Sequence, residues 1–521
     1  MGLASRQMVE HVKPLPDGLV TAPAALPSSP GRVARIADRL SGEALLFPVV
    51  GLYLIAIFGA LPQQLLSDSW YAVLGGHEIV HHGLPAGDAL TIWTHGQQWV
   101  DQQWLGQLFF YGLYAAGGIK LALFGHAAAA SAAFALAIVF ARRHGGSVRT
   151  ICWLAVPTIF LVIWGSWNAR AQSLAFVLFV ALLWLLVSDA RAQSRRVLLV
   201  LPILVLWANV HGSVVTGALL VVLAGLSYGF DRRKQAWQSW VPRAAMLCGG
   251  PIVCLVASPY ALKLPEYYRH VLINPGFRDY ILEWQPTTPG LKTSPFYLLA
   301  FAAVWLIGRR GERLSSFEKV ALVATILIGL QSIRGVIWFA FAAFMLLPRL
   351  LGGGELKPAA STARLRIASG ALVALSVVVV AATVAIVAAK PASWFERDYP
   401  EGAVAAVQRA EAKQPQVRVF ASTQYSDWLL LRLPDLRGRV AYDARFELLP
   451  TYRLRQLVDV RRQVEGWRNV VAPFGLFVLK EGPDDEGSLI RGLLRQEHAR
   501  VLYRGNGAVV LSRPVKRGLG G

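Results

Sequence analysis

Long apolar segments recur along the chain, and they limit what it can fold into more than any other feature. A membrane-spanning helix needs about 20 mostly apolar residues, or fewer where flanking side chains reach the interface. Charged residues make up only 16% of the 521 residues, whereas soluble domains carry about 25%. The sequence therefore predicts a mainly α-helical, polytopic membrane protein with about eleven transmembrane helices. The predicted segments are 44–62, 119–141, 150–167, 171–188, 197–210, 213–230, 243–258, 295–308, 319–333, 335–349 and 367–389.

Basic residues indicate how these segments are oriented. They cluster in every second connection, and the positive-inside rule places such connections in the cytoplasm. We therefore expect a cytoplasmic N-terminal tail (1–43), a transmembrane domain (44–389) and a C-terminal region outside. Segment 105–118 is also apolar, but counting it as a span would move Arg142 and Arg143 outside. We expect it to be a helix in the outer interface.

The net charge of +21 forms no basic patch with interleaved aromatic residues, so nucleic acid is not an expected partner.

The composition changes beyond Lys390. Short apolar segments typical of strands alternate with polar segments of helical spacing, which predicts a small extracytoplasmic α/β domain over 390–512. A disordered tail is expected at 513–521. The expected strands are 417–422, 439–444, 469–472, 476–479, 500–504 and 508–512, and the expected helices are 400–412, 450–466 and 486–498.

The first outer loop (63–118) is the richest source of candidate chemistry. It combines acidic, histidine and tryptophan side chains with no Lys or Arg over 63–104. Asp68 precedes a helical pattern over 69–82, so it is either that helix's N-cap or a catalytic or metal-binding group. Asp88 is a turn residue or a ligand, and Asp101 is a cap or a ligand. The spacing of His77 and His81 does not fit the metalloprotease motif.

Other polar residues lie at the outer ends of the spans: Arg170, Gln172, Asn209, His211, Glu283 and Arg334. Each alone is compatible with a satisfied helix end, but ionisable groups at membrane depth indicate function. Together they predict a cavity on the side of the long loop, where the two arginines meet carboxylates. Such a cavity suits a lipid phosphate beside an acid or base. Trp70 is a candidate for stacking on sugar, or an interfacial anchor.

The order and spacing of several short motifs resemble the GT-C glycosyltransferases and the bacterial membrane proteins related to them. The resemblance covers nearly the whole chain. It departs from the family pattern at Leu66, Gln102 and Gln103, where acidic or histidine residues are usual. The matching motifs include Asp68-Ser-Trp70-Tyr71, Gly83-Leu-Pro85, Asp88, Trp99-Val100, Trp104-Leu105, Arg170-Ala-Gln172, Trp207-Ala-Asn209-Val-His211, Ser258-Pro-Tyr260, Glu283-Trp284, Arg334 and Asp443-Ala-Arg445.

The resemblance implies an enzyme that transfers sugar from a polyprenyl-phosphate donor to a glycan, lipid or protein acceptor of the cell envelope. It places the reaction on the outer face of a bacterial cytoplasmic membrane and makes Asp68 the essential acid. We expect Asp68 to act as a general base with inversion. No metal ligand is predicted, and a divalent cofactor has only weak support. The alternatives are a non-catalytic scaffold and an envelope-lipid or polysaccharide transporter. The expected substrate-binding residues are Trp70, His77, Asp88, Asp101, Gln103, Arg170, Gln172, Asn209, His211, Glu283 and Arg334.

Overall fold

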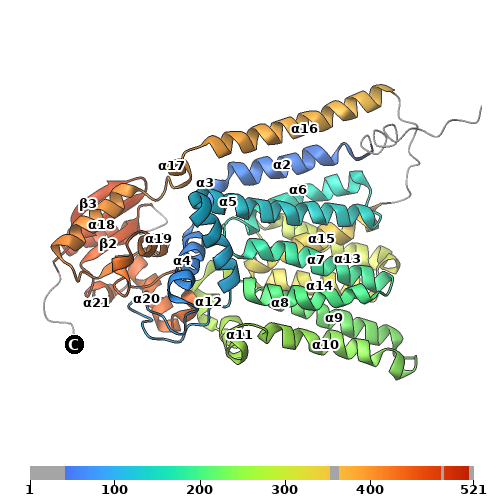
Figure 1. Cartoon of the computed structure of the whole chain (residues 1–521), viewed down its shortest axis with the longest axis horizontal. Helices are drawn as coiled ribbons and strands as arrows, with labels where there is room; N and C mark the ends of the chain where they lie inside the picture. The colour runs from blue at the N-terminus through green and yellow to red at the C-terminus, as the bar shows by residue number, and fades with distance from the viewer. Residues whose placement is uncertain (1–41, 353–362, 483–485, 515–521) are drawn as a thin grey trace, which may run out of the picture.

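The computed structural model describes residues 42–352, 363–482 and 486–514. It contains a bundle of long apolar helices with a small mixed α/β domain at one end (Figure 1). The predicted mainly α-helical membrane fold with a C-terminal α/β domain is confirmed. Most of the predicted N-terminal tail, and the C-terminal tail from residue 515, lie outside the described residues.

Each of the eleven predicted segments coincides with a helix. Within the described residues, six helices are at least 18 residues long and apolar enough to cross a membrane, and a bent pair would make a seventh. The count of eleven spans therefore stays a prediction. The helices are α2 (Leu46–Gly59), α5 (Trp104–Arg143), α6 (Val148–Gly165), α7 (Gln172–Arg191), α8 (Val200–Val210), α9 (Val214–Arg232), α10 (Val241–Val256), α13 (Ser294–Arg310), α14 (Ser316–Gln331), α15 (Val336–Leu351) and α16 (Ala363–Ala389).

Helix α15 forms the centre of the bundle. All of its residues from Val336 to Pro348 are buried, and it packs against α5, α6, α13 and α14. A helix that is apolar on every side belongs in such a position. The peripheral helix α16 is different, because it packs against α2 and leaves most of its apolar surface outside the protein, where lipid would cover it.

Two helical segments of the first outer loop lie across the end of the bundle (Figure 1). One is α4 (Ser67–His82), which agrees with the predicted helix over 69–82. The other is the first part of α5, which breaks from helical geometry at Gly117 and Gly118. Gly118 has φ +65°, a conformation that glycine adopts without the strain other residues incur. The break separates this segment from the long second part of α5, as expected for 105–118.

The C-terminal domain has a four-stranded mixed sheet in the order β1-β2-β4-β3. Strands β1 (Val419–Ala421) and β2 (Leu476–Lys480) are parallel, whereas β4 (Ala508–Ser512) is antiparallel to both β2 and β3 (Arg500–Gly505). Its helices are α18 (Glu401–Lys413), α19 (Thr423–Arg432), α20 (Thr451–Arg462), α21 (Trp467–Val471) and α22 (Gly487–Gln496).

Two of the six predicted strands are wrong. Residues 469–472 fall mainly in α21, because a short apolar run fits a buried helix as well as a strand. Residues 439–444 form only isolated bridges at Val440.

In addition, Arg513 belongs to the domain rather than to a tail. Its side chain is buried and it pairs with Glu497 at 2.7 Å.

Backbone hydrogen bonds join the first outer loop to this domain. Val440 bridges both Val419 of β1 and Thr91 of the loop. The backbone N–H of Ile92 donates to the Val440 carbonyl at 2.8 Å, and the ring of Trp93 stacks on Tyr442 with centroids 5.3 Å apart. The segment around Val440 thus lies beside β1, and the loop pairs with that segment, so the domain and the loop that contains Asp68 are joined.

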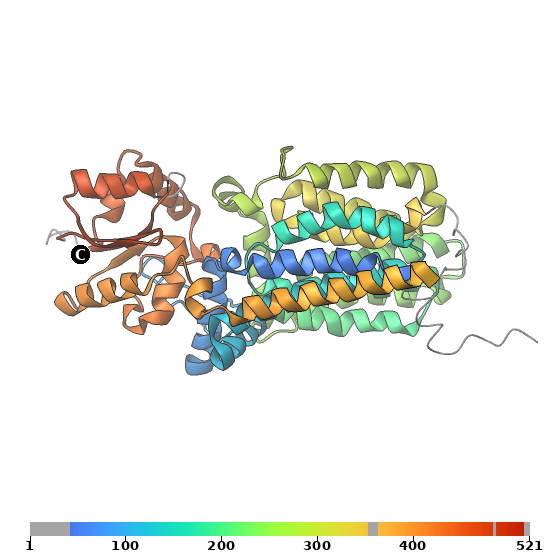
Figure 2. The ribbon, with the colours of Figure 1, turned by 90° about the horizontal axis from the view of Figure 1, so that it is seen from above.

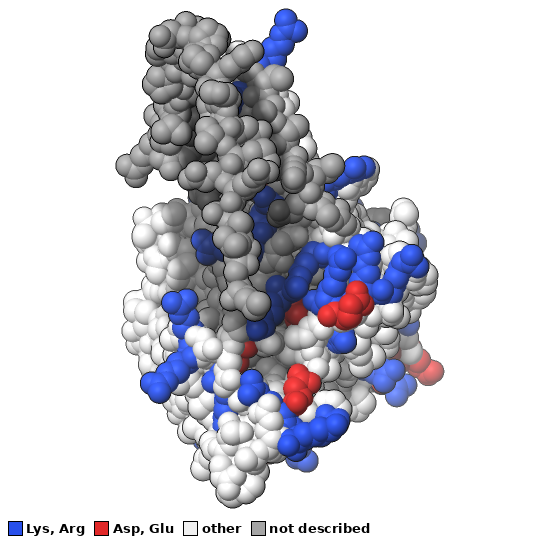
Figure 3. Space-filling model, turned by 90° about the vertical axis from the view of Figure 1, so that its right-hand side faces the viewer, with Lys and Arg blue, Asp and Glu red and all other residues white. Residues whose placement is uncertain are grey.

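The bundle has a basic end. The helices run lengthwise from the C-terminal domain to the opposite end (Figure 2), where Lys and Arg side chains gather (Figure 3). Arginines occupy the last turns of α5, α7, α9, α13 and α15. The basic residues that we expected in alternate connections therefore gather at one end of the bundle, opposite the C-terminal domain.

Candidate active site

Four charged side chains from distant parts of the sequence meet at the end of the bundle that faces the C-terminal domain. An Arg170 Nη1 donor lies 2.6 Å from Asp68 Oδ2 and 3.1 Å from Glu283 Oε2. Arg334 Nε lies 3.5 Å from the same Glu283 oxygen. We call Asp68, Arg170, Glu283 and Arg334 the charged cluster. Its charges alternate and balance, and it joins α4, the α6–α7 connection, η4 (Leu282–Trp284) and η6 (Ile333–Gly335).

Asp68 does not cap its helix, so that interpretation is wrong. Leu66 occupies the N-cap position, and its backbone N–H donates to Ser69 Oγ at 3.2 Å. Asp68 is the second residue of α4, and its carboxylate turns to Arg170 instead. Its side chain remains 29% exposed, which leaves one face open to a ligand.

Neighbouring groups hold both arginines in place. Gln172 accepts a hydrogen bond from Arg170 Nε at 3.0 Å, so Gln172 positions the arginine rather than facing a ligand itself. The guanidinium of Arg334 lies over the ring of Trp284, 5.1 Å from its centroid. Burial alone would raise the pKa of Glu283, but Arg170 and Arg334 lower it below its ordinary value. Glu283 therefore stays ionised and balances the second arginine.

His211 adds a neutral donor to this group. The backbone N–H of Ser213 donates to His211 Nδ1 at 3.1 Å, so the ring proton of the neutral histidine lies on Nε2. Burial, with the charges of Arg334 and Arg170, holds the pKa of His211 well below its ordinary value. The ring is therefore neutral at physiological pH, and Nε2–H is available as a donor.

Several of the predicted binding residues lie outside the charged cluster. Trp70 is fully buried, with its ring against Tyr114 and Tyr399, so it belongs to the core and cannot reach a sugar. Asn209 accepts from Trp104 Nε1 and donates to the carbonyls of Val205 and Ala257, each at 2.8 Å. These bonds link α5, α8 and the end of α10, so Asn209 has a structural role.

His77 is also away from the charged cluster. It is nine residues beyond Asp68 in α4, which is about 14 Å along the helix axis at 1.5 Å per residue. Its ring packs against His81 and Tyr111, and burial lowers its pKa. We assign it to the packing of α4 on α5.

The carboxylate of Asp88 already has hydrogen-bond partners within the chain. Its carboxylate accepts from the backbone N–H of Leu90, from Thr91 and Thr94, and from Arg445 Nη2 at 2.7 Å. Arg445 also pairs with Asp443, with Nε 2.8 Å from Oδ2. We call Asp88, Arg445 and Asp443 the buried clamp. It joins the first outer loop to the C-terminal domain, so Asp88 is not free to bind substrate.

Asp101 is fully buried, and its Oδ1 accepts from Gln107 at 2.9 Å. Burial, followed by the charge of Glu447, raises the pKa of Asp101 to about 8. This carboxyl is therefore mostly protonated at neutral pH. Gln103 follows it in the loop, and its side chain lies near the hydroxyl of Tyr71 in α4.

Glu447 is a residue that the sequence did not indicate. It follows the clamp in η8 (Phe446–Leu448), and burial raises its pKa to about 7. The charges of Asp443 and Asp68 add to that increase. Nothing in its own sequence neighbourhood singles it out, because its surroundings come from α4 and from the outer segments of the bundle.

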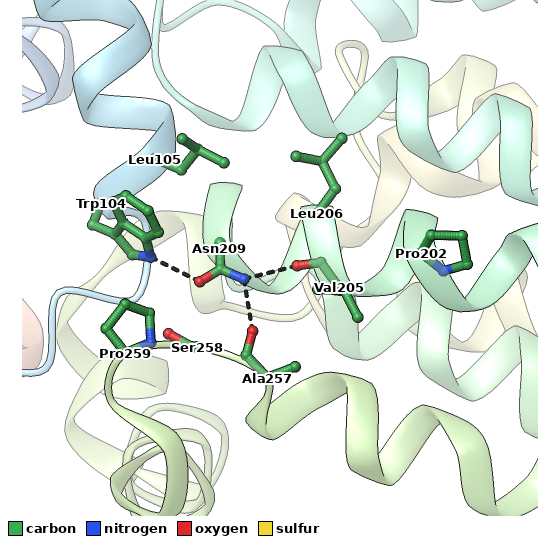
Figure 4. Close-up of a pocket in the computed structure, with 9 residues that line it drawn as sticks. All are labelled: Trp104, Leu105, Pro202, Val205, Leu206, Asn209, Ala257, Ser258 and Pro259. Atoms are coloured by element: carbon green, nitrogen blue, oxygen red, sulfur yellow. Dashed lines mark hydrogen bonds between the residues drawn. The ribbon is translucent and has the colours of Figure 1, made fainter.

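Two cavities lie near these groups. The first is an apolar groove of about 590 Å³ between α5, α8 and the end of α10 (Figure 4). Leu105, Pro202 and Leu206 line it, and Asn209 supplies its polar atoms. The second has about 770 Å³ and lies between the loop residues 97–100, α11 (Leu264–Ile273) and the C-terminal domain, with Glu447 in its wall.

The described residues contain no group of three His, Cys, Asp or Glu side chains placed to hold a metal ion. The acidic side chains of the charged cluster are paired with arginines instead.

Comparison with known proteins shows the fold. No protein-family model matches the sequence, and no curated protein matches it. The crystal structure of ArnT from Cupriavidus metallidurans in the apo state matches over 90% of this chain and 98% of that chain, with a TM-score of 0.51 and 14% identity. The structure of the same protein bound to undecaprenyl phosphate has a TM-score of 0.48 over the same shares. The chain thus has an ArnT-like fold, in agreement with the GT-C resemblance.

Proposed function

We propose that this chain is an integral membrane glycosyltransferase that transfers a sugar from a polyprenyl-phosphate donor to a cell-envelope acceptor. The ArnT-like fold supports the enzyme class. The charged cluster is the observation that carries the proposal, because two arginines lie beside a partly exposed carboxylate at one end of the bundle. Arginine binds phosphate with a fixed fork of donors, which suits a phosphate leaving group. The apolar groove of Figure 4 offers a surface for a prenyl chain.

Asp68 is the proposed general base. Its Oδ2 accepts a hydrogen bond from Arg170 Nη1 at 2.6 Å. A donor phosphate competes for the same guanidinium, so donor binding would release Asp68. The base and the leaving-group site would then be assembled by the substrate itself.

In the transfer step, the acceptor hydroxyl oxygen attacks the anomeric carbon and its proton passes to Asp68. The new oxygen–carbon bond forms as the bond from carbon to the phosphate oxygen breaks, and the leaving phosphate keeps the electron pair. Arg170, Arg334 and His211 Nε2–H stabilise that charge. A single displacement with one base inverts the anomeric configuration, since no covalent intermediate forms.

We also propose the orientation of the chain in a bacterial cytoplasmic membrane. The basic end of the bundle would face the cytoplasm together with the N-terminus. The charged cluster and the C-terminal domain would then lie on the outer face. The polar groups gather at one end of the bundle rather than at its middle, which does not favour a transporter.

The test uses the purified chain in lipid nanodiscs with a radiolabelled polyprenyl-phosphate sugar of defined anomeric configuration. An enzyme releases polyprenyl phosphate and forms a product of inverted configuration. Retained configuration would refute the single displacement. A donor that stays intact would indicate a scaffold. Intact donor moved across the membrane of a vesicle would indicate a transporter.

A further inference from the structure

The larger of the two cavities has both polar and apolar lining residues and is built from three separate parts of the chain. Gln97 and Gln98 come from the first outer loop, His270 and Asn274 from α11 and the residue that follows it, and Glu447 from the C-terminal domain. Its volume of about 770 Å³ lies within the range of about 300–1,000 Å³ that ligand pockets occupy. Amide, imidazole, carboxylate and basic groups line it, the basic ones being Lys263 and Arg269, unlike the apolar groove of Figure 4. The two cavities therefore suit different parts of a reaction.

The cavity is close to the charged cluster. Burial is the main cause of the raised pKa of Glu447, and the charge of Asp68 adds to it, so the two carboxyl groups are within electrostatic reach of each other. On the opposite wall, Tyr267 is within electrostatic reach of Arg334. A ligand in the cavity would therefore lie beside the cluster, on the side away from the interior of the bundle.

The cavity also borders the membrane surface. Helix α11 is bent by 103° from the apolar helix α10. Its end leaves Leu272 50% exposed, while Tyr267, His270 and Ile273 line the cavity. A helix with one apolar and one polar face lies in the plane of a membrane interface. The cavity would thus open where the head groups of lipids and the glycans of the envelope are found.

Glu447 is the distinctive group of this cavity. Within the described residues no cationic side chain forms an ion pair with it, whereas Asp68 and Glu283 are both paired with arginine. It is also fixed in position, because it lies two residues after Arg445 of the buried clamp. Lys263 and Arg269 also line the cavity, and within the described residues neither forms an ion pair with Glu447. A carboxylate that is fixed in position and forms no ion pair can accept hydrogen bonds from hydroxyl groups of a ligand.

We propose that this cavity binds the acceptor, in the form of a hydroxyl-rich head group, and that Glu447 accepts a hydrogen bond from one of its hydroxyls. The inference rests on the proposed function and assigns the acceptor to a site that the C-terminal domain helps to build. Glu447 is a binding residue here, and Asp68 remains the base. The domain would then determine which acceptor is used, while the bundle binds the donor.

The experiment separates acceptor binding from donor cleavage. Nanodiscs with wild-type chain or a variant receive the radiolabelled polyprenyl-phosphate sugar, and we measure two products: sugar released to water, and sugar transferred to an acceptor. One arm supplies the extracted lipid fraction of a bacterial envelope, and the other supplies its water-soluble glycan fraction. The arm with transfer identifies the source of the head group.

Two variants test the site, and a third variant serves as a matched control. Glu447→Gln weakens the hydrogen-bond acceptor, and Gln98→Trp fills the cavity from the loop. Both should raise the KM for the acceptor fraction about tenfold or more and leave the release of sugar to water within about twofold of wild type. Glu465→Gln alters an exposed glutamate of the same domain outside the cavity, and it should change neither product.

Three results would overturn the inference. Wild-type acceptor KM in both variants would place the acceptor elsewhere. Equal loss of transfer and release to water would make the cavity part of the donor site or of the fold. If the wild type consumes no donor, the proposed function fails and this inference fails with it.

Discussion

Arg445 of the buried clamp offers a sharp test of how the two parts of the molecule are joined. Its side chain and that of Asp88 are both fully buried, and Asp443 is 4% exposed. Arg445→Met keeps much of the volume but removes the charge that both carboxylates share. Its guanidinium also lies 4.3 Å from the centre of the Trp99 ring, so the substitution loses that contact as well.

The expected cost follows from the unpaired carboxylates. Removing one partner from a buried ion pair costs about 3–5 kcal/mol, since the remaining charge is left without compensation. Asp88 keeps three other hydrogen bonds, from Leu90, Thr91 and Thr94, which favours the lower end of that range. A loss of about 3 kcal/mol corresponds to about a hundredfold increase in local opening, at tenfold for each 1.4 kcal/mol.

Hydrogen exchange at the backbone of residues 90–93 and 438–441 measures this opening. The amides of Ile92, Trp93 and Gly438 bond across the junction, so they should exchange about a hundredfold faster in Arg445→Met. Arg504→Met removes an exposed pair with Glu481 on the same domain and should leave these amides unchanged. Unchanged exchange in Arg445→Met would refute the conclusion that the clamp joins the loop to the domain.

Two further predictions concern the site and its surroundings. Arg334→Gln removes a charged donor for the leaving phosphate, worth about 1.5–3 kcal/mol. The kcat/KM for the donor should fall about 10- to 150-fold in the nanodisc assay, and an unchanged value would exclude Arg334 from donor recognition. Burial raises the pKa of Asp101 to about 8 from 3.8, so the folded chain keeps a proton that the unfolded chain releases above about pH 4. Stability should fall as the pH rises from about 4 to 8, and the always neutral Asp101→Asn should raise the melting temperature more at pH 8 than at pH 5; an equal effect at both pH values would show that Asp101 is ionised in the folded chain.

Much of the bundle could be predicted from the sequence, because apolar runs and alternating basic connections report directly on how a chain sits in a membrane. The segment 105–118 shows this clearly. Charge alternation alone separated it from the rest of α5, and the structure places the break at Gly117 and Gly118. The C-terminal domain was harder to predict from the sequence. Apolar runs as short as 469–472 do not distinguish a strand from the buried helix that forms there.

The pairing of side chains could not be predicted in the same way. Asp68 and Arg170 lie 102 positions apart, and no periodicity indicates that they meet at 2.6 Å. The capping interpretation of Asp68 failed because α4 begins two residues earlier than the polar pattern indicates. The sequence leaves Asp88 as a turn residue or a ligand, and only the fold shows that Arg445 of the C-terminal domain pairs with it. The surroundings of Glu447 depend on three distant segments in the same way.

The measurement that tests the central claim most directly is the rate of donor consumption by Asp68→Asn in nanodiscs. Asn keeps an oxygen that can accept a hydrogen bond from Arg170, so the melting temperature should stay close to that of the wild type. It cannot take a proton from the acceptor hydroxyl, and loss of a general base lowers the rate on the order of 10²–10⁴. We therefore predict a folded protein that consumes the labelled donor at least about a hundredfold more slowly. A folded Asp68→Asn variant that consumes the donor at the wild-type rate would contradict the account.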